Sequence, residues 1–198
     1  MKTHEIIKKA LAKLGGSGSG NFGHAGRPGK RGGSASRTGV IALQGMVGWG
    51  AVPKETQAML LGDIGKVPPE HLEGCSFSIG HDPDSRITYK GWDRELIINP
   101  DNVQKDDLVH DVGHHVEQTM LTRVQKDAIA KERSSSISTD IAPEFLKWDD
   151  ETFSELYKLY LLGRPSQDFP MINGVIKAVV ESPPPPKPRG ELGYKVVH

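Results

Sequence analysis

Residues 108–117 (LVHDVGHHVE) place two histidines four positions apart within an apolar stretch. In a helix this spacing puts the imidazoles of His110 and His114 on the same face, slightly more than one turn apart. Two imidazoles so arranged are the first two ligands of zinc sites of the H-E-x-x-H type, which also need a third protein ligand and an open position for water. The stretch therefore predicts a metal-binding helix over about residues 103–120, around which the rest of the domain must pack.

The third ligand is expected from a second acidic pattern, residues 149–157 (DDETFSELY), which we predict to open another helix. The carboxylates of Glu151 and Glu155 are four positions apart and share a helix face. Glu151 can then bind the metal while Glu155 accepts a hydrogen bond from one of the histidines, because ligating histidines usually need an acceptor on their second ring nitrogen. Gly113, between the two histidines, permits another backbone to approach closely beneath the metal.

Asp111 occupies the position of the glutamate in the H-E-x-x-H pattern, where the general base stands. An aspartate is one methylene shorter than a glutamate, and misplacement of a reacting group by about 1 Å can lower the rate roughly 100-fold. Three outcomes are therefore open: a slow enzyme, an enzyme in which the water has shifted toward Asp111, and a protein that binds the metal without catalysis.

Basic charge is concentrated near the N-terminus of a chain that is neutral as a whole. Residues 1–38 carry eight lysines and arginines against one glutamate, which gives +7 and leaves −7 for the remaining residues. We predict a short basic amphipathic helix over 1–14 and a Gly/Ser-rich flexible linker over 15–39. A folded domain follows over 40–181, and a Pro-rich disordered tail over 182–198.

Composition also narrows the expected compartment and partners. No apolar run approaches the roughly 18 residues of a membrane span, and the N-terminus lacks the apolar core of a signal peptide. Cys75 is the only cysteine, so an internal disulfide is excluded. We therefore expect a soluble protein without a membrane partner. The basic arm suits contact with an acidic surface, although a solvated tail is the simpler interpretation, and nucleic acid is not an expected partner.

The folded domain places three short strands before its longest helices. Strands are predicted near residues 75–79, 86–89 and 95–98, and helices near 54–62, 103–120, 122–133, 149–163 and 168–180. This order predicts an α+β fold in which a small mixed sheet packs on the metal-binding helix and the C-terminal helices complete a cleft. We expect the strand at 95–98 to form the edge beside the cleft, where a peptide can pair with it.

A family resemblance adds to this interpretation. The similar segments are residues 87–89, 96–100, 108–116, 151–157 and 169–180. They resemble the zincin metallopeptidases, most of all the gluzincin catalytic domain of the anthrax lethal factor type, over about residues 65–180. The resemblance implies a zincin-like fold and zinc-dependent hydrolysis of a peptide bond in a protein or peptide substrate. It assigns the zinc ligands to His110, His114 and Glu151. It places Asp111 at the position of the general base and Glu155 at that of the supporting carboxylate.

Two details depart from the family or extend beyond it. The family often places a tyrosine shortly before the ligand glutamate, where this chain has Trp148, so Tyr157 and Tyr160 are the tyrosines expected to stabilise an oxyanion. The linker segment 20–34 resembles a low-complexity element of phage head and portal-associated proteins. That resemblance implies a phage-encoded or toxin-like protein, in the virion or the host cytoplasm, whose N-terminal arm contacts a phage structural protein.

Two other functions are compatible with the same residues. A non-catalytic, zincin-like binding module of a virion would keep the fold and would account for Asp111. An HD-type metal phosphohydrolase is the second alternative, because His110-Asp111 is similar to the His-Asp motif of that family. It would recruit His81 and a distant aspartate such as Asp140, but that family is all-helical.

The remaining polar and aromatic side chains of note are interpreted as structural. We expect His115 to be packed or exposed away from the metal, and Cys75 to lie in the core. We interpret Trp49 and Trp92 as packing residues. The histidines without partners in the sequence are expected to be exposed: His24, His71 and His81.

Overall fold

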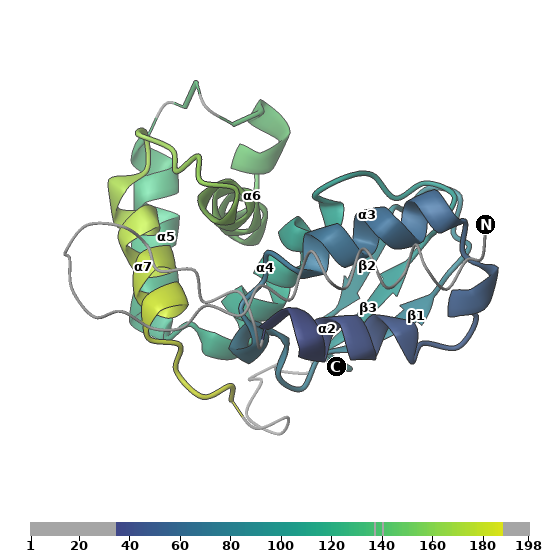
Figure 1. Ribbon diagram of the computed structural model, residues 1–198. Helices are drawn as coiled ribbons and strands as arrows, with labels where there is room; N and C mark the ends of the chain where they lie inside the picture. Colours follow the sequence, from purple (N-terminus) through teal and green to yellow (C-terminus); the bar gives the residue numbers. More distant parts are fainter. Residues whose placement is uncertain (1–34, 137, 140, 188–198) are drawn as a thin grey trace, which may run out of the picture.

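The computed structural model describes residues 35–136, 138, 139 and 141–187 (Figure 1). The predicted helix 1–14 and the predicted linker up to residue 34 lie outside this part of the chain. The described elements follow one another in this order: α2 (Ala35–Gln44), η1 (Trp49–Ala51), α3 (Lys54–Ile64), η2 (Pro69–Leu72), β1 (Ser76–Ile79), β2 (Ile87–Lys90), β3 (Glu95–Ile98), α4 (Asp107–Met120), α5 (Arg123–Ser135), η3 (Pro143–Leu146), α6 (Asp149–Leu161) and α7 (Pro170–Glu181).

Helix α2 begins at Ala35, so residues 35–39, which the composition assigns to the linker, are helical. Gly39 allows this helix to pack closely. A Cβ at this position would stand 2.4 Å from Cγ1 of Ile64 and 2.8 Å from Cδ1 of Leu72. The glycine therefore serves close contact of α2 with α3 and η2, and the folded domain begins earlier than residue 40.

The three strands form one mixed sheet in the order β1-β3-β2. β1 and β3 run parallel with Phe77 opposite Leu96, and β2 and β3 run antiparallel with Tyr89 opposite Leu96. β3 is therefore the central strand, and the prediction that residues 95–98 form an edge is wrong. Burial explains the difference, because Leu96 and Ile98 lie in the core whereas β2 alternates half-buried and exposed residues, as an edge strand does.

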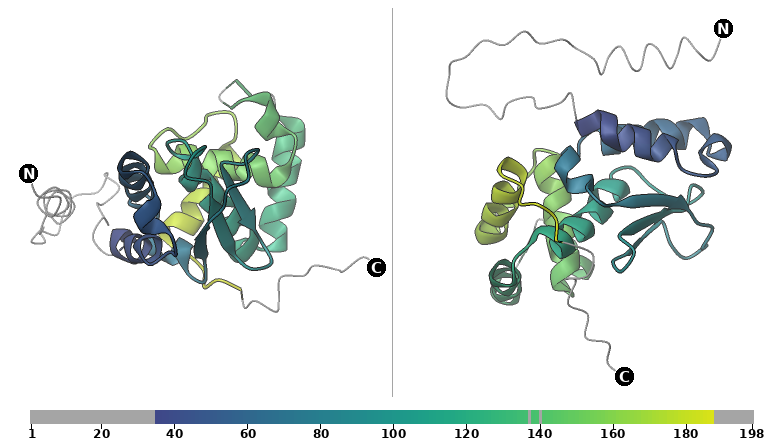
Figure 2. Two further views of the ribbon diagram at one scale, coloured as in Figure 1. Left: turned by 90° about the vertical axis from the view of Figure 1, so that its right-hand side faces the viewer. Right: turned by 90° about the horizontal axis from the view of Figure 1, so that it is seen from below.

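Helix α4 lies between two groups of elements (Figures 1 and 2). The sheet, α2 and α3 lie on one side of it, and α5, α6 and α7 lie on the other. Because α4 has neighbours on both sides, Leu108, Val109, Val112 and Val116 are all fully buried. The predicted α+β class, with a small sheet against a central helix, is confirmed. Among the described residues no helix combines the length and apolar character needed to cross a membrane.

The chain after α7 returns to the C-terminal end of α4. The Lys187 amide donates a hydrogen bond to the Thr119 carbonyl at 3.0 Å, and its ammonium group donates to the Leu121 carbonyl at 2.5 Å. The Arg94 guanidinium donates to the carbonyl of Lys187. A cation at the end of a helix satisfies carbonyls that have no partner within it. The segment after α7 is therefore held against the domain at Lys187, and the rest of the predicted tail, residues 188–198, lies outside the described part.

Candidate metal centre

Helix α4 brings the two predicted histidine ligands to one face. The ring centroids of His110 and His114 are 5.1 Å apart, and both side chains are largely buried, with 13% and 14% exposed. The helix begins at Asp107, a few residues later than predicted, and ends at Met120 as predicted. The spacing argument therefore holds in the fold, and the two imidazoles form one wall of a common site.

Helix α6 packs on α4 at Gly113. A Cβ at this glycine would stand 2.7 Å from Cα of Ser154 and 3.0 Å from its Cβ, closer than real side chains approach a backbone. The absence of a side chain at Gly113 thus lets the two helices touch, as predicted. Glu151 and Glu155 flank Ser154 on α6, so the same contact carries both carboxylates to the histidines.

The Glu151 carboxylate faces both imidazoles. Its Oε2 is 3.3 Å from Nε2 of His110, and its Oε1 is 3.6 Å from Nε2 of His114. One donor atom from each of the three residues lies within 4.8 Å of the other two. A tetrahedral zinc ion with ligands at about 2.1 Å separates its donor atoms by about 3.4 Å. The three side chains predicted as ligands therefore come together in a cluster that could hold a metal ion.

Glu155 supports His110 from the side away from Glu151. Its Oε2 is 3.2 Å from Nδ1 of His110 and 2.6 Å from the ammonium group of Lys158. The Phe145 ring packs on the His110 ring at 5.4 Å between centroids, and Lys158 lies 5.7 Å above the same phenyl ring. Glu155 thus contacts His110 as predicted. Phe145 was missed because only the folded structure brings η3 to α6, whereas Lys158 follows Glu155 by three residues on α6, and this local spacing was an available signal.

Asp150 is a further carboxylate that the sequence analysis did not single out. Its Oδ2 is 4.0 Å from Nδ1 of His114, and its side chain is more than half exposed. Ligating histidines commonly donate their second N–H to a carboxylate. The sequence signal that could have identified Asp150 is the run of three acidic residues that opens α6, in which Asp150 directly precedes Glu151.

The charges of this cluster shift the pKa values of its members. Burial lowers the pKa of His110, but hydrogen bonds to Glu151 and Glu155 outweigh it and raise this pKa to about 9. The hydrogen bond from His110 lowers the pKa of Glu151. Burial, followed by the charge on His110, lowers the pKa of His114. At neutral pH His110 therefore carries positive charge at the place where the carboxylates favour a cation.

Asp111 lies in a cleft of about 430 Å³ together with His114 and Glu151. Burial raises the pKa of the Asp111 carboxyl to about 7. The strand side of the cleft consists of β2 residues, including Tyr89, so the edge strand beside the cleft is β2 and not residues 95–98. Asp111 thus lines the same cleft as two of the predicted ligands.

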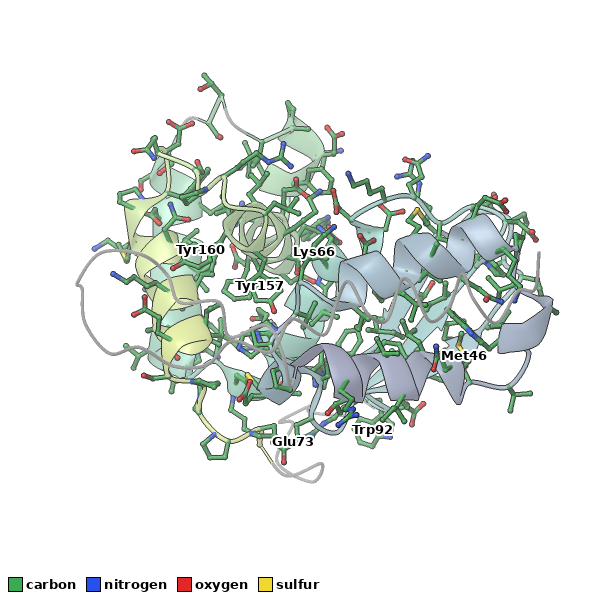
Figure 3. All side chains as sticks on the ribbon, in the orientation of Figure 1. Met46, Lys66, Glu73, Trp92, Tyr157 and Tyr160 are labelled. Carbon is green, nitrogen blue, oxygen red and sulfur yellow. The ribbon has the colours of Figure 1, made fainter. Side chains whose placement is uncertain are left out.

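Tyr157 and Tyr160 both project from α6 (Figure 3), and neither is among the residues that line the cleft. Tyr157 is fully buried, with its hydroxyl oxygen 2.6 Å from Nδ1 of His71. Burial, followed by the charge of Glu181 on α7, raises the pKa of Tyr160. The expectation that Tyr157 or Tyr160 stabilises an oxyanion is therefore wrong, because neither side chain lines the cleft.

Two histidines that the sequence did not assign to a site are fully buried. His71 lies between the Tyr157 hydroxyl and the Val179 carbonyl, so the prediction that it is exposed is wrong. His115 is packed, as one of the two expectations for it stated. Its Nδ1 is 3.1 Å from the Tyr89 hydroxyl, and its Nε2 is 3.2 Å from the Glu73 carbonyl.

The ligand set of a phosphohydrolase is not assembled among the described residues. His81 is exposed, as predicted, and lies 4.0 Å from Asp101, away from the histidines of α4. Asp140 and His24 lie outside the described residues. Trp92 is 67% exposed, contrary to its interpretation as a packing residue, whereas Trp49 and Cys75 are partly buried against the core.

Comparisons of the chain with protein-family models, with curated proteins and with solved structures find no match. The geometry of His110, His114 and Glu151 is therefore the basis on which a function is proposed. The cleft beside these residues limits the proposal to reactions in which a substrate can reach Asp111.

Proposed function

We propose that the chain is a zinc-dependent metallopeptidase with a zincin-like fold, which hydrolyses a peptide bond in a protein or peptide substrate. The observation that carries the proposal is the Glu151 carboxylate, which faces Nε2 of both His110 and His114 at a spacing suited to a tetrahedral ion. Three protein ligands leave a fourth position for water, and this arrangement is typical of catalytic rather than structural zinc sites.

Each residue of the site has a defined task in this proposal. His110, His114 and Glu151 hold the zinc, which when bound lowers the pKa of water and polarises the peptide carbonyl. Asp111 accepts the proton of the attacking water, and a carboxyl with a pKa of about 7 suits a general base at neutral pH. Glu155 accepts a hydrogen bond from Nδ1 of His110 and keeps that ring turned toward Glu151.

The substrate is proposed to lie along β2. This strand pairs only with β3 in the described sheet, and its residues line the cleft on the side opposite the helices. An extended peptide can add to such an edge by backbone hydrogen bonds, which brings its carbonyl groups past Asp111. The edge therefore supports a peptide substrate over a compact small molecule.

A phage context is part of the proposal through the Gly-rich segment 20–34, whose resemblance to phage head and portal-associated proteins supports a virion-associated or effector role. In either setting the basic arm of residues 1–38 would contact a phage structural protein. Asp111 also supports a second candidate, a non-catalytic binding module of zincin shape, because a shorter base lowers the expected rate.

Elemental mass spectrometry of protein purified without a histidine tag tests the proposal. We expect about one zinc per chain, as three protein ligands and a water imply, with loss of the metal in His110→Ala. His81→Ala is the matched control, because His81 is exposed and outside the cluster. A chain that takes up no zinc contradicts the site, and a zinc-loaded chain that cleaves no peptide favours the binding module.

A further inference from the structure

Phe145 brings an aromatic ring to the candidate centre from outside helices α4 and α6. It lies on η3, and its ring centroid is 5.4 Å from that of His110, with an interplanar angle of 51°. Its side chain is half-buried and packs against the core. Phe145 has no donor atom for a metal and is not among the residues that line the cleft. Any effect of this ring on the metal must therefore act through His110.

The backbone of η3 is fastened to the helices on both sides of it. The hydroxyl group of Thr152 on α6, which is fully buried, donates a hydrogen bond to the Phe145 carbonyl at 2.6 Å. The guanidinium of Arg133 on α5 donates to the Leu146 carbonyl at 3.0 Å and pairs with Asp149 at the start of α6. The Phe145 ring is thus carried by an anchored segment and has a fixed position beside His110.

The same ring lies beside both donors to one carboxylate oxygen. Oε2 of Glu155 is 3.2 Å from Nδ1 of His110 and 2.6 Å from the ammonium group of Lys158, and that ammonium lies 5.7 Å from the centroid of Phe145. The side chains of Glu155 and Lys158 are only 9% and 20% exposed. Phe145 therefore covers a charged hydrogen-bonded contact, which is stronger where water is excluded.

The carboxylates around His110 constrain its ring incompletely. Glu151 contacts Nε2 and Glu155 contacts Nδ1, so both contacts act through the ring nitrogens. Rotation of the imidazole about the line between these nitrogens is the motion that such contacts oppose least. A phenyl ring packed against the imidazole opposes this rotation by steric contact. Ligand side chains hold a metal well only when packing fixes their rotamers in this way.

We propose that Phe145 is a positioning residue of the candidate metal centre, whose ring holds the His110 imidazole in its ligating orientation and keeps water from the hydrogen bond to Glu155. The inference rests on the proposed zinc site and adds to it a residue that acts through a ligand. The apolar groups around a metal site control access of solvent, and the partners of ligating histidines typically change metal affinity by about 10- to 100-fold.

Zinc titration in competition with a chelator tests the inference. We expect Phe145→Ala to raise the dissociation constant for zinc by about 10-fold or more, because the imidazole loses its packing partner. Phe145→Tyr keeps the ring and should bind zinc as wild type does. Leu146→Ala is the matched control, since Leu146 is also half-buried on η3 but carries no ring to pack on His110. Thermal unfolding without metal confirms that each variant is folded.

Nitrogen-edited NMR of the imidazole groups in the zinc-loaded protein supplies a second readout, which a general loss of stability would not reproduce. The Nδ1 proton of His110 should exchange slowly with water in wild type, in Phe145→Tyr and in Leu146→Ala, and faster in Phe145→Ala. A folded Phe145→Ala with wild-type zinc affinity and wild-type exchange overturns the inference.

Equal losses of zinc affinity in Phe145→Ala and Leu146→Ala, or in Phe145→Ala and Phe145→Tyr, also overturn the inference, because neither result depends on the ring. A wild type that binds no zinc overturns both this inference and the proposed site. A wild type that binds zinc and cleaves no peptide contradicts the peptidase alone, and the role of Phe145 at the metal stands.

Discussion

Asp111 is the residue on which the proposed catalysis depends most, because it stands where the H-E-x-x-H pattern has a longer side chain. Burial raises its pKa to about 7, so the ionised base and its acid form coexist near neutral pH. We predict that Asp111→Glu retains or raises kcat/KM for a peptide, since a longer carboxylate reaches further into the cleft. Asp111→Asn should lower kcat/KM by about 10²- to 10⁴-fold, the usual contribution of a general base.

Steady-state kinetics, with metal content measured on the same samples, check this prediction. Zinc content should stay the same in both variants, because Asp111 is not one of the three grouped donors. A loss of activity in Asp111→Glu as large as that in Asp111→Asn would argue against the base assignment.

At the scale of single residues, local spacing predicted the cluster but not the burial of other histidines. His110 and His114 lie on one helix, and the i,i+4 rule is sufficient to bring them to one face. His71 and His115 are buried by partners far away in the sequence, Tyr157 and Glu73 among them, with separations of 86 and 42 residues. No local pattern reveals such partners, because they are set by how the elements pack.

At the scale of elements, the contact between α4 and α6 at Gly113 positions the whole candidate centre. We predict that Gly113→Ala lowers the free energy of unfolding by about 1–3 kcal/mol, because its methyl group would overlap the backbone of Ser154 and force the helices apart. The same displacement carries Glu151 away from the histidines, so zinc affinity should fall as well. Denaturant unfolding and zinc titration measure the two effects.

Gly174→Ala is the matched control for this substitution. Gly174 also lies within a helix, α7, but nothing stands within 4 Å of a Cβ placed there. The control should raise stability by up to about 1 kcal/mol, since alanine favours helices over glycine, and should leave zinc affinity unchanged. Equal effects of the two substitutions would contradict the role assigned to the close contact at Gly113.

Helices with a strong apolar periodicity were predicted well, whereas the pairing of the strands was not. The bounds of α4, α6 and α7 fall within a few residues of the predicted ranges, because an apolar stripe of helical period is a local signal. The order of the strands in the sheet, by contrast, has no such local signal. β1 reaches the far side of β3 and pairs with it in parallel, so β3 is enclosed, and this choice depends on contacts that no single strand encodes.

At the scale of the whole molecule, His71 joins parts of the fold that are distant in the sequence. It belongs to η2, and its ring lies between the Tyr157 hydroxyl of α6 at 2.6 Å and the Val179 carbonyl of α7 at 3.2 Å. The carbonyl can only accept, so Nε2 donates to it and Nδ1 accepts from the tyrosine. The neutral ring thus satisfies both partners, and a protonated ring would lose the bond from Tyr157 within the core.

This arrangement makes stability depend on pH. Burial lowers the pKa of His71 from 6.5 to about 4 in the folded chain. Between these pH values the unfolded chain binds a proton that the folded chain does not, so the free energy of unfolding falls as the pH drops from 6.5 to 4 and is unaffected by this residue above 6.5. The difference of 2.5 pH units corresponds to about 3 kcal/mol.

His71→Gln tests this dependence, because its amide can still donate to the Val179 carbonyl but cannot titrate. We expect the variant to be less stable than wild type at pH 7, since the contact with Tyr157 is altered, and to lose less stability between pH 6.5 and 4 by about 3 kcal/mol. Urea unfolding at a series of pH values measures both quantities. Other groups titrate in the same range, so the difference between the two proteins isolates His71. Parallel curves for wild type and His71→Gln would show that this ring is not the source of the acid sensitivity.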